Sequence, residues 1–433
     1  MTRIKLPYNW VARDYQERYL AKIDTPVAEG GVKRAIHVWH RRGGKDLTDF
    51  NFTIKKTQER VGAYWHVFPT YSQGRKAMWE GITNKGDGYL TFIPPQIIES
   101  INKQEMNIKF KNGSIWRVVG ADNINALVGA GVVGVVFSEM SLQSPQAWQY
   151  IEPMLLENDG WAVFNGTPRG ENHFYDMVEM AKGNPNWYVD IKTIDDTNIV
   201  THEQIEDLRK EGRPEEIIQQ EYYCSFAGSI HGAYYADMMR KCKDDNRICS
   251  VPVDDNVLVN TAWDLGVNDA TSIWFYQTVG KEIHLIDYYE NTGQGLAHYA
   301  AMLIQRGYNY GKHYAPHDIK ARELSSGKSR LEIAEKMGIK FEVVPMLTII
   351  DGIGAVRGTL SKCWFDADKC KAGINAMKQY RKDWDDKHQR FKDHPLHDWS
   401  SNCADAFRYL AVSYRDITVK SHSNITLKTG FRL

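Results

Sequence analysis

The sequence of 433 residues has few cysteines, no long apolar run and no surplus of charge. No stretch approaches the roughly 18 consecutive apolar residues that a membrane-spanning helix needs, so we expect no membrane insertion. The six cysteines form no Cys-x-x-Cys pair and follow no apolar signal segment, which favours reduced thiols in the cytoplasm. Lys plus Arg and Asp plus Glu number 54 each, so binding to a polyanion needs a local basic face.

The composition is that of a globular protein. Hydrophobic residues make up 42% of the chain and charged residues 25%, and no low-complexity tract suggests disorder. Single hydrophobic cores seldom grow beyond roughly 250 to 300 residues. The length therefore predicts two domains with separate cores.

The stretch HVWHRRGGKDLTDF, residues 37–50, almost matches a Walker A phosphate loop. The apolar run 34–40 predicts a strand and residues 47–58 a helix, so the glycines lie in the strand–turn–helix context that the motif requires. Glycine N–H groups and the helix N-terminus would bind phosphate, and Lys45 would reach the terminal phosphates. Trp39 and Asp46 break the pattern, and a solvated basic turn is the alternative.

Four more strand-like runs, 62–70, 114–121, 131–140 and 160–170, alternate in part with helix-like stretches. This alternation predicts a mostly parallel α/β sheet. In such a sheet ligands bind beyond the carboxyl ends of the strands. Polar residues follow three of these runs there: Thr70, Ser138, Glu139, Asn165 and Thr167.

The run 131–140 is typical of the second ATPase signature, in which a buried strand delivers acidic residues to the metal and the attacking water. The usual pair is Asp-Glu, but here Ser138 precedes Glu139. An Asp therefore stands in the loop where a hydroxyl is usual, and a hydroxyl stands after the strand where an Asp is usual. This predicts that Asp46 and Ser138 have exchanged roles toward Mg²⁺, with Glu139 as the base that activates water.

The second half of the chain delivers carboxylates from strands and from a helix. Residues 260–277 predict a hairpin with Asp264 at the end of its first strand, and 282–291 a third strand. A fourth strand ends at Asp318, a fifth covers 340–346, and 397–414 has helical periodicity. This is the chain order of an RNase H-like domain.

On the predicted final helix, spacings of four and three place Asp398, Asn402 and Asp405 on one face. Together with two strand-end aspartates they would form a carboxylate cluster, which is stable when divalent cations lie between its members. Two metal ions are the standard means of cutting a phosphodiester. For any single Asp, a helix cap or a solvated surface charge is the alternative.

The motifs together resemble the large terminase subunits of tailed double-stranded-DNA phages. DYQ (14–16), HRRGGKD (40–46), YWHVFPTYSQGRKAMW (64–79), GADNINALVG (120–129), VVGVVFSEMS (132–141) and FNGTPRG (164–170) resemble their ATPase domain. DLGVNDATS (264–272), APHD (315–318), GIGAVRGTL (352–360) and HDWSSNCADAFRYLA (397–411) resemble their nuclease domain. The implied fold is an N-terminal P-loop ATPase with a mostly parallel sheet, followed by an RNase H-like mixed-sheet nuclease domain.

The resemblance implies a role for each matched residue. The adenine would lie at Tyr15 and Gln16, and the phosphates would be wrapped by Arg42, Gly43, Gly44, Lys45 and Asp46. Asn165 and Thr167 belong to the implied coupling motif that senses the terminal phosphate. The implied catalytic and metal-binding core of the nuclease is Asp264, Asp318 and Asp405, with Asp398 as an outer candidate and Asp269 as a weaker one.

Two departures from the family matter. Val128 stands where such terminases often carry a candidate arginine finger, and Arg117, Arg75 or Arg169 are the possible substitutes. Asn402 stands where a His is frequent, and an amide oxygen is generally a weaker metal ligand than a carboxylate. The nuclease could therefore be weak, or His397 could compensate, although a packed or capping histidine is the alternative.

By this resemblance the chain is a viral DNA-packaging motor with ATPase and endonuclease activities, using ATP and Mg²⁺, with Mn²⁺ as an alternative in the nuclease. The implied partners are double-stranded DNA, a portal protein and a small terminase subunit. The motor would form a pentameric ring on a procapsid in the cytoplasm of an infected bacterium, with a monomer in solution left open. Rival hypotheses are a helicase-nuclease of DNA repair or recombination and an inactive capsid-docking protein.

The motifs suggest domain boundaries. The expected ATPase domain covers 1–195, a helical linker region 196–252, the nuclease domain 253–418 and a flexible tail 419–433. No sustained strand pattern is seen between about 177 and 254. Phosphate contacts to DNA would be independent of sequence and weakened by salt, and the basic candidates follow Asp318: Lys320, Arg322, Lys328 and Arg330, for which a solvated helix and loop is the alternative.

Overall fold

The computed structural model describes residues 4–122, 131–228, 232–266, 270–321, 329–385 and 390–423. The chain divides into two compact units, Met1–Ser229 and Ile230–Leu433. The division falls inside the predicted linker region. Within the described ranges no helix is both long and apolar enough to span a membrane.

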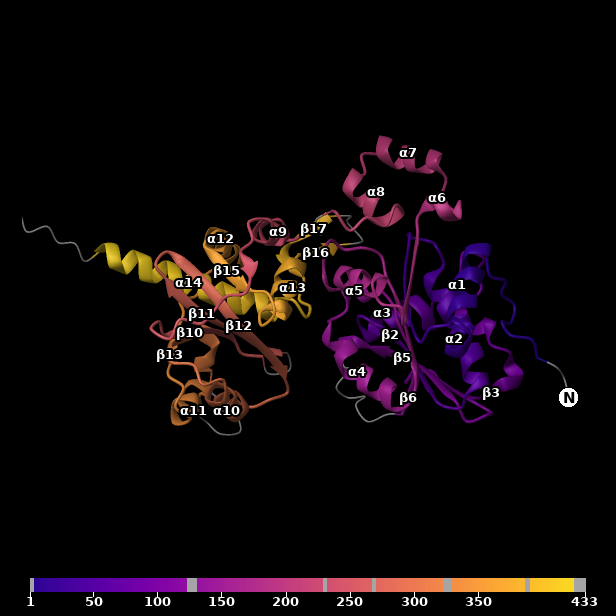
Figure 1. Cartoon of the computed structure of the whole chain (residues 1–433), viewed down its shortest axis with the longest axis horizontal. Helices are drawn as coiled ribbons and strands as arrows, with labels where there is room; N and C mark the ends of the chain where they lie inside the picture. The colour runs from indigo at the N-terminus through magenta and orange to yellow at the C-terminus, as the bar shows by residue number, and fades with distance from the viewer. Residues whose placement is uncertain are drawn as a thin grey trace, which may run out of the picture. The chain divides into compact units, whose positions relative to one another are not determined.

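The first unit is built on an eight-stranded sheet in the order β3-β4-β5-β2-β6-β7-β1-β8 (Figure 1). Six strands from β5 to β8 are parallel, and β3 and β4 add an antiparallel hairpin at one edge. The strands are β1 (Arg34–Trp39), β2 (Ala63–Phe68), β3 (Ile98–Asn102), β4 (Asn107–Phe110), β5 (Ile115–Gly120), β6 (Val132–Phe137), β7 (Trp161–Asn165) and β8 (Trp187–Lys192).

Helices cover both faces of this sheet, as expected for a parallel α/β architecture. Aromatic and aliphatic residues of α1 and α2 pack on one face, and those of α4 and α5 pack on the other (Figure 1). The helices are α1 (Asp14–Asp24), α2 (Lys45–Glu59), α3 (Tyr71–Gly74), α4 (Gln146–Glu157), α5 (His173–Lys182), α6 (Ile194–Thr197), α7 (His202–Lys210) and α8 (Glu215–Tyr222).

Strand β8 corrects the prediction that no strand lies between about 177 and 254. It pairs with β1 over six residues, from Trp187 to Lys192. Only one of its residues, Asp190, is buried, and β8 lies at the edge of the sheet. The apolar residues Trp187, Val189 and Ile191 alternate along β8 and pack against the core, so the sequence held a strand pattern that the prediction missed.

The second unit holds a seven-stranded mixed sheet in the order β14-β13-β10-β11-β12-β15-β9. At its centre, β10, β11 and β12 are paired antiparallel. Strand β13 lies parallel beside β10, and β14 lies parallel beside β13. The strands are β9 (Ile248–Cys249), β10 (Val259–Asp264), β11 (Ala270–Val279), β12 (Glu282–Thr292), β13 (Tyr310–Ala315), β14 (Phe341–Val343) and β15 (Cys363–Asp366).

Numbered along the chain from β10, these five strands have the order 5-4-1-2-3, which is the RNase H-like arrangement predicted from the sequence. Strands β15 and β9 extend it in parallel beyond β12, and β15 was not predicted as a strand. A separate hairpin joins β16 (Lys382–Asp385) and β17 (Arg390–Pro395).

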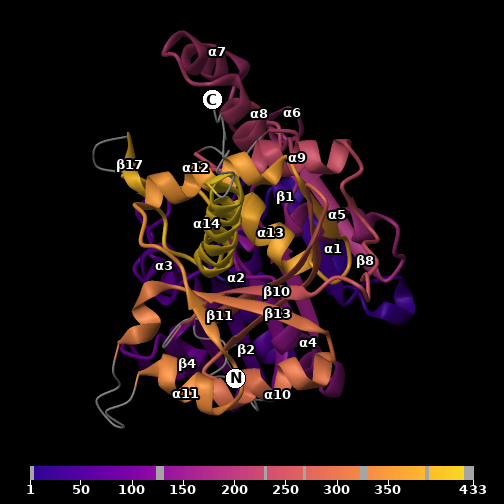
Figure 2. The same ribbon diagram turned by 90° about the vertical axis from the view of Figure 1, so that its left-hand side faces the viewer.

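Helices also cover both faces of the second sheet (Figure 2). One core contains residues of α9, α12, α13 and α14, and the opposite core contains residues of α10 and α11. Their bounds are α9 (Ala236–Asp244), α10 (Leu296–Arg306), α11 (Arg330–Lys336), α12 (Ile349–Leu360), α13 (Lys371–Gln379) and α14 (Ser401–Ser423).

Candidate functional site

The phosphate loop has the backbone that its glycines predict. Strand β1 ends at Trp39 and α2 begins at Lys45. Gly44 has φ +79°, a left-handed conformation that glycine adopts without strain. A Cβ on Gly43 would lie 3.0 Å from the carbonyl oxygen of His40. The predicted strand, glycine turn and helix are therefore present, with the N–H groups of the first turn of α2 left for a ligand.

Helix α1 supports this loop from the side. The hydroxyl of Tyr15 donates to the carbonyl oxygen of Gly43 at 2.6 Å, and Nε2 of Gln16 donates to the same oxygen at 3.3 Å. Lys45 is buried, and its Nζ donates to the carbonyl oxygen of Trp39 at 3.1 Å. Tyr15 and Gln16 thus contact the phosphate loop, and their place at an adenine stays a prediction.

Asp46 and Ser138 meet beside the loop. Strands β6, β7 and β1 are neighbours in the sheet, so the residues that follow them lie at one edge. The hydroxyl of Ser138 donates to Oδ1 of Asp46 at 2.7 Å, and Nδ2 of Asn165 donates to the same oxygen at 3.1 Å. A carboxylate and a hydroxyl thus stand side by side. Both are oxygen donors of the kind that Mg²⁺ prefers, so these residues fit such an ion.

Asp49, one turn after Asp46, is part of this network and was missed in the sequence. Its Oδ2 accepts from Nδ2 of Asn165 at 2.7 Å and lies 2.8 Å from Nε2 of His37. Asp49 and His37 are fully buried. The spacing of three between the two aspartates, on one helix face, was the available signal. Asn165 is therefore fixed by two carboxylates.

His66 lies behind Ser138 in the same network. Its Nε2 is 3.1 Å from the Ser138 hydroxyl, and burial lowers the pKa of His66 to about 4. The imidazole is therefore neutral at pH 7. Because the Ser138 proton is directed at Asp46, Nε2 of His66 carries the proton and donates. This contact orients the hydroxyl toward the carboxylate.

Glu139 follows Ser138 in a strained conformation. Its φ is +55°, which is uncommon for a residue other than glycine and is often found at functional sites. Its backbone N–H donates to Oδ1 of Asn165 at 3.2 Å, and the Thr167 hydroxyl donates to its carboxylate at 3.5 Å. Asn165, the last residue of β7, and Thr167 therefore hold Glu139 close to Asp46, and its role as a water-activating base stays a prediction.

The three candidate arginine fingers make different contacts. Arg75 stacks on Tyr71 at 5.6 Å and donates to the carbonyl oxygen of Gln104 at 3.1 Å. Arg117 lies on β5, paired between β4 and β2. Arg169 instead forms an ion pair with Glu221 at 3.2 Å, and Glu221 also contacts the phosphate loop. Val128 lies outside the described residues.

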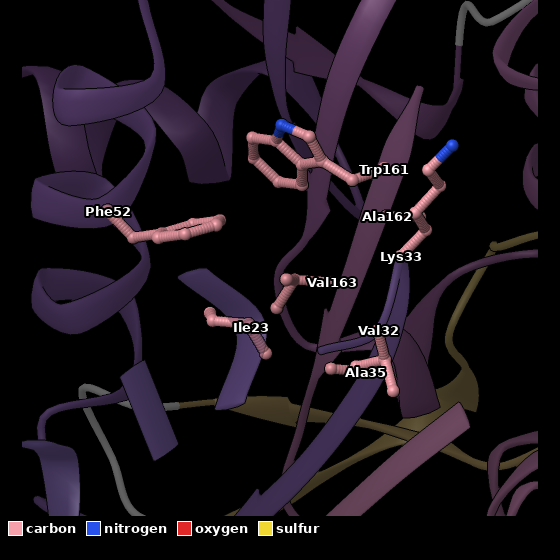
Figure 3. A pocket seen from close by; sticks show the side chains of 8 residues that line it. All are labelled: Ile23, Val32, Lys33, Ala35, Phe52, Trp161, Ala162 and Val163. Carbon is pink, nitrogen blue, oxygen red and sulfur yellow. The ribbon is translucent and has the colours of Figure 1, made fainter. Parts of the chain in front are cut away.

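The first unit has an apolar pocket (Figure 3). Ile23 and Phe52 line it from α1 and α2, and Trp161 and Val163 line it from β7. Its other lining residues include Ala35, near the start of β1, whereas the phosphate loop follows the end of that strand. Its cavity volume is only about 10 Å³, so it cannot admit a nucleotide base.

In the second unit, topology brings Asp264 and Asp318 to one edge of the sheet. Strands β10 and β13 are parallel neighbours. Asp264 is the last residue of β10, and exposed Asp318 follows β13 in the short helix His317–Lys320. Helix α14 packs on β10 and β11. Burial raises the pKa of Tyr409 on α14, and Asp264 and Asp405 raise it further, so both carboxylates lie near this ring.

Asp405 is held in an ion pair. Its Oδ1 lies 2.9 Å from Nη1 of Arg408. Burial raises the pKa of Asp405, although Arg408 and His397 oppose that shift. Among the residues that the structure describes, no group of three or more His, Cys, Asp or Glu side chains is close enough to hold a metal ion. The donors have the right chemistry, but the predicted three-aspartate centre is not assembled as one group.

Asp398 requires a correction, because it does not lie on the final helix. Helix α14 begins at Ser401, so the helical spacing that linked Asp398 with Asn402 and Asp405 does not apply. The Asp398 carboxylate pairs with Arg381 at 3.1 Å and accepts from the N–H of Ser400 at 2.9 Å. These contacts form a turn ahead of the helix, so Asp398 is neither a residue of α14 nor its N-cap.

The remaining candidates of the second unit are placed as follows. Nδ1 of His397 lies 3.0 Å from the Ser401 hydroxyl, and Asn402 is buried. Lys320 is exposed, whereas Arg330 begins α11 and donates to the carbonyl oxygen of Leu265 at 3.5 Å. Three candidates lie outside the described residues: Asp269, Arg322 and Lys328.

These observations assign each unit to a class of protein fold. The first is a parallel α/β unit whose glycine turn, basic residue and carboxylate–hydroxyl pair meet at one sheet edge, as in P-loop ATPases. The second has the strand order of RNase H-like nucleases, with carboxylates at the ends of β10 and β13.

The chain is similar in sequence to the large terminase subunit of Escherichia phage T5, with 22% identity over 392 residues, covering 85% of this chain and 84% of the relative. The resemblance predicted from the motifs is therefore confirmed. No protein-family model matches.

Solved structures of large terminases are also similar to this chain. The large terminase of a thermophilic bacteriophage matches 92% of this chain and 98% of its own, with 16% identity and a TM-score of 0.42. The ATPase domain of a Thermus phage large terminase matches 52% of this chain and 100% of its own, with 19% identity and a TM-score of 0.42.

Proposed function

We propose that the chain is a viral DNA-packaging motor that couples ATP hydrolysis to translocation of double-stranded DNA into a procapsid and cuts concatemeric DNA with its second unit. The observation that carries the proposal is the meeting of Asp46, Ser138 and Asn165 beside the phosphate loop. It occurs in a chain that is similar to a large terminase subunit over most of its length.

In the proposed ATPase site, each contact has a chemical role. The loop of Arg42, Gly43 and Gly44 and the start of α2 bind phosphates through N–H groups, and Lys45 adds positive charge. Mg²⁺, held by Asp46 and Ser138, would neutralise charge on the phosphates. Glu139 accepts a proton from the attacking water.

Asn165, at the end of β7, and Thr167, just after it, connect the two sides of this site. Asn165 touches Asp46 and Asp49, and Thr167 touches Glu139. Loss of the terminal phosphate would therefore change the contacts of Asn165 and Thr167 and so the position of this segment. This supports the proposed coupling role of Asn165 and Thr167.

The proposed nuclease site consists of Asp264, Asp318 and Asp405. In support, Asp264 ends β10 and Asp318 follows β13, its parallel neighbour, and the carboxylates of Asp264 and Asp405 both raise the pKa of Tyr409 on α14. The chemistry of these donors suits Mg²⁺ or Mn²⁺. Release of Asp405 from Arg408 would free a ligand for such an ion.

The proposed assembly follows from the resemblance. The partners would be double-stranded DNA, a portal protein and a small terminase subunit, with a pentameric ring on the procapsid in the cytoplasm of the infected bacterium. The proposed ATPase domain, 1–195, linker region, 196–252, and nuclease domain, 253–418, would be separate functional parts of one motor.

The experiment that tests the proposal follows duplex DNA during ATP hydrolysis. A moving motor displaces a third strand bound to the duplex but leaves the two duplex strands paired. The packaging motor is expected to displace the third strand only with ATP, and Lys45→Ala should abolish this. Strand separation would favour a helicase-nuclease, and ATP turnover that is absent or unaffected by Lys45→Ala would contradict the proposed motor.

A further inference from the structure

Alternate residues from the end of β7 onward reach different parts of the proposed ATPase site. Asn165 donates to Asp46 at 3.1 Å, and Thr167 donates to Glu139 at 3.5 Å. The next residue in this series, Arg169, pairs with Glu221 at 3.2 Å. The contacts of Asn165 and Thr167 lie at the proposed metal and water positions. The contact of Arg169 continues this series to Glu221 on α8.

Glu221 joins α8 to the phosphate loop in two ways. Its carbonyl oxygen accepts from the backbone N–H of Arg41 at 2.7 Å. Its carboxylate lies 3.2 Å from Nη2 of Arg169 and 3.5 Å from Nη1 of Arg41. The residue is only 4% exposed, and a buried carboxylate is stable when it is paired with cations. The carboxylate thus holds the guanidinium of Arg169, whereas the largely exposed Arg41 makes the longer contact.

The charges around Glu221 favour an additional anion. Two arginines share one carboxylate, and Lys45 begins α2 directly after the loop that contains Arg41. Nε of Arg169 is buried and has no hydrogen-bond partner among the described residues. A buried donor without an acceptor is costly, whereas an arginine fork suits a phosphate well. The positive charge of the arginines and the buried Nε–H donor of Arg169 could therefore both bind a phosphoryl group.

We propose that Arg169 binds the terminal phosphate of the bound nucleotide and that Glu221 is the positioning residue that holds Arg169 for this contact. The inference rests on the proposed function, in which the loop of Gly43 to Asp46 binds ATP. The terminal phosphate is the chosen ligand because Thr167, two residues before Arg169, contacts the proposed water-activating Glu139. Arg169 thus distinguishes ATP from ADP.

The test compares binding of ATPγS and ADP to the full chain by titration calorimetry in the presence of Mg²⁺. Arg169→Gln should weaken ATPγS binding by about tenfold or more, as expected for one charge-assisted hydrogen bond. ADP binding should stay within about twofold of the unaltered chain. Glu221→Gln should show the same selective loss, because Arg169 is no longer held. ADP binding also reports that each variant has folded.

Two controls sharpen the result. Glu216→Gln removes a charge from an exposed position of the same helix and should change neither affinity. The double variant of Arg169 and Glu221 should lose less than the product of the two single losses, since both act on one contact. Equal weakening of ATPγS and ADP, no weakening, or fully multiplicative losses would overturn the inference. If the unaltered chain bound neither nucleotide, the proposed function itself would fail.

Discussion

At the scale of single residues, the exchange between Asp46 and Ser138 is the feature that departs most from the usual ATPase pattern. The two side chains are within hydrogen-bond distance, at 2.7 Å. A carboxylate from the loop and a hydroxyl from the strand therefore replace the usual hydroxyl and carboxylate at one place. The ion would still have one oxygen donor of each kind.

Asp46→Ala and Ser138→Ala should each lower Mg²⁺-dependent ATP turnover by about 10- to 100-fold, as is typical when groups around a metal are lost. The double variant Asp46→Ser, Ser138→Asp restores the usual arrangement and should regain part of the activity lost by the single changes. Steady-state hydrolysis at varied Mg²⁺ measures this. Unchanged Mg-ATP affinity and turnover in both alanine variants would show that the exchange is wrong.

His66 makes the first unit sensitive to acid. Burial lowers its pKa to about 4 from 6.5, so the folded protein takes up its proton less readily than the unfolded chain. As the pH falls from 7 to 5, the unfolded state gains protons and the folded state loses about 2 kcal/mol of stability from this group.

His66→Gln keeps a donor for Ser138 and should remove that part of the acid sensitivity. Urea unfolding at pH 7 and pH 5 measures the difference in the free energy of unfolding. An identical pH dependence in His66→Gln would contradict the assigned protonation of His66.

At the scale of elements, the glycines of α12 have different roles. A Cβ on Gly352 would lie 2.2 Å from Cδ of Arg408, whereas Gly354 has nothing within 4 Å. Arg408 is the partner of Asp405. The absence of a side chain at Gly352 therefore makes room for the arginine that holds a proposed nuclease carboxylate.

Gly352→Ala should destabilise the second unit by about 1–3 kcal/mol through overpacking. Gly354→Ala, the same change two residues later, should stabilise it by about 0.5–1 kcal/mol through helix propensity. Thermal unfolding of the two variants measures the opposite signs. A loss of stability in both, or in neither, would contradict the packing of α12 against α14.

The sequence predicted the elements whose patterns are strongly apolar. The buried runs at β2, β5, β6 and β7 and the five strands from β10 to β14 are all present, because alternating or continuous burial leaves a visible pattern. Strand β8 was missed although Trp187, Val189 and Ile191 alternate along it, because this short pattern stands among polar and helical segments. The start of α14 was misplaced because Asp398 lies in a turn before the helix, and such a turn is fixed by local hydrogen bonds rather than by periodicity.

The site could be predicted only in part. Glycine turns and strand ends gave Lys45, Asp46, Ser138 and Glu139, since parallel strands bring their carboxyl ends together. The contacts of Glu221 with Arg41 and Arg169 could not be foreseen, because they join residues far apart in sequence. The ion pair between Asp405 and Arg408 also depends on packing that the helical spacing alone does not reveal.

At the scale of the whole molecule, the balanced charge limits how DNA can be bound. With 54 basic and 54 acidic residues, attraction to DNA must come from a local surface such as that around exposed Lys320. Contacts of this kind bind phosphates and do not read bases.

The affinity of the full chain for duplex DNA should therefore be the same for unrelated sequences and should fall with salt. A surface that neutralises two phosphates loses about tenfold in affinity between 50 and 200 mM salt, and more contacts give a steeper loss. Fluorescence anisotropy with two unrelated duplexes at several salt concentrations measures both. Sequence-dependent or salt-independent affinity would contradict binding through the phosphates.

The account rests most directly on ATP hydrolysis at the phosphate loop of the first unit. The decisive measurement is the Mg²⁺-dependent ATP turnover of the full chain beside Lys45→Ala and Glu139→Gln. The account predicts turnover in the unaltered chain, loss of nucleotide binding and turnover in Lys45→Ala, and nucleotide binding without turnover in Glu139→Gln. Turnover that persists in both variants, or that is absent from the unaltered chain, would contradict it.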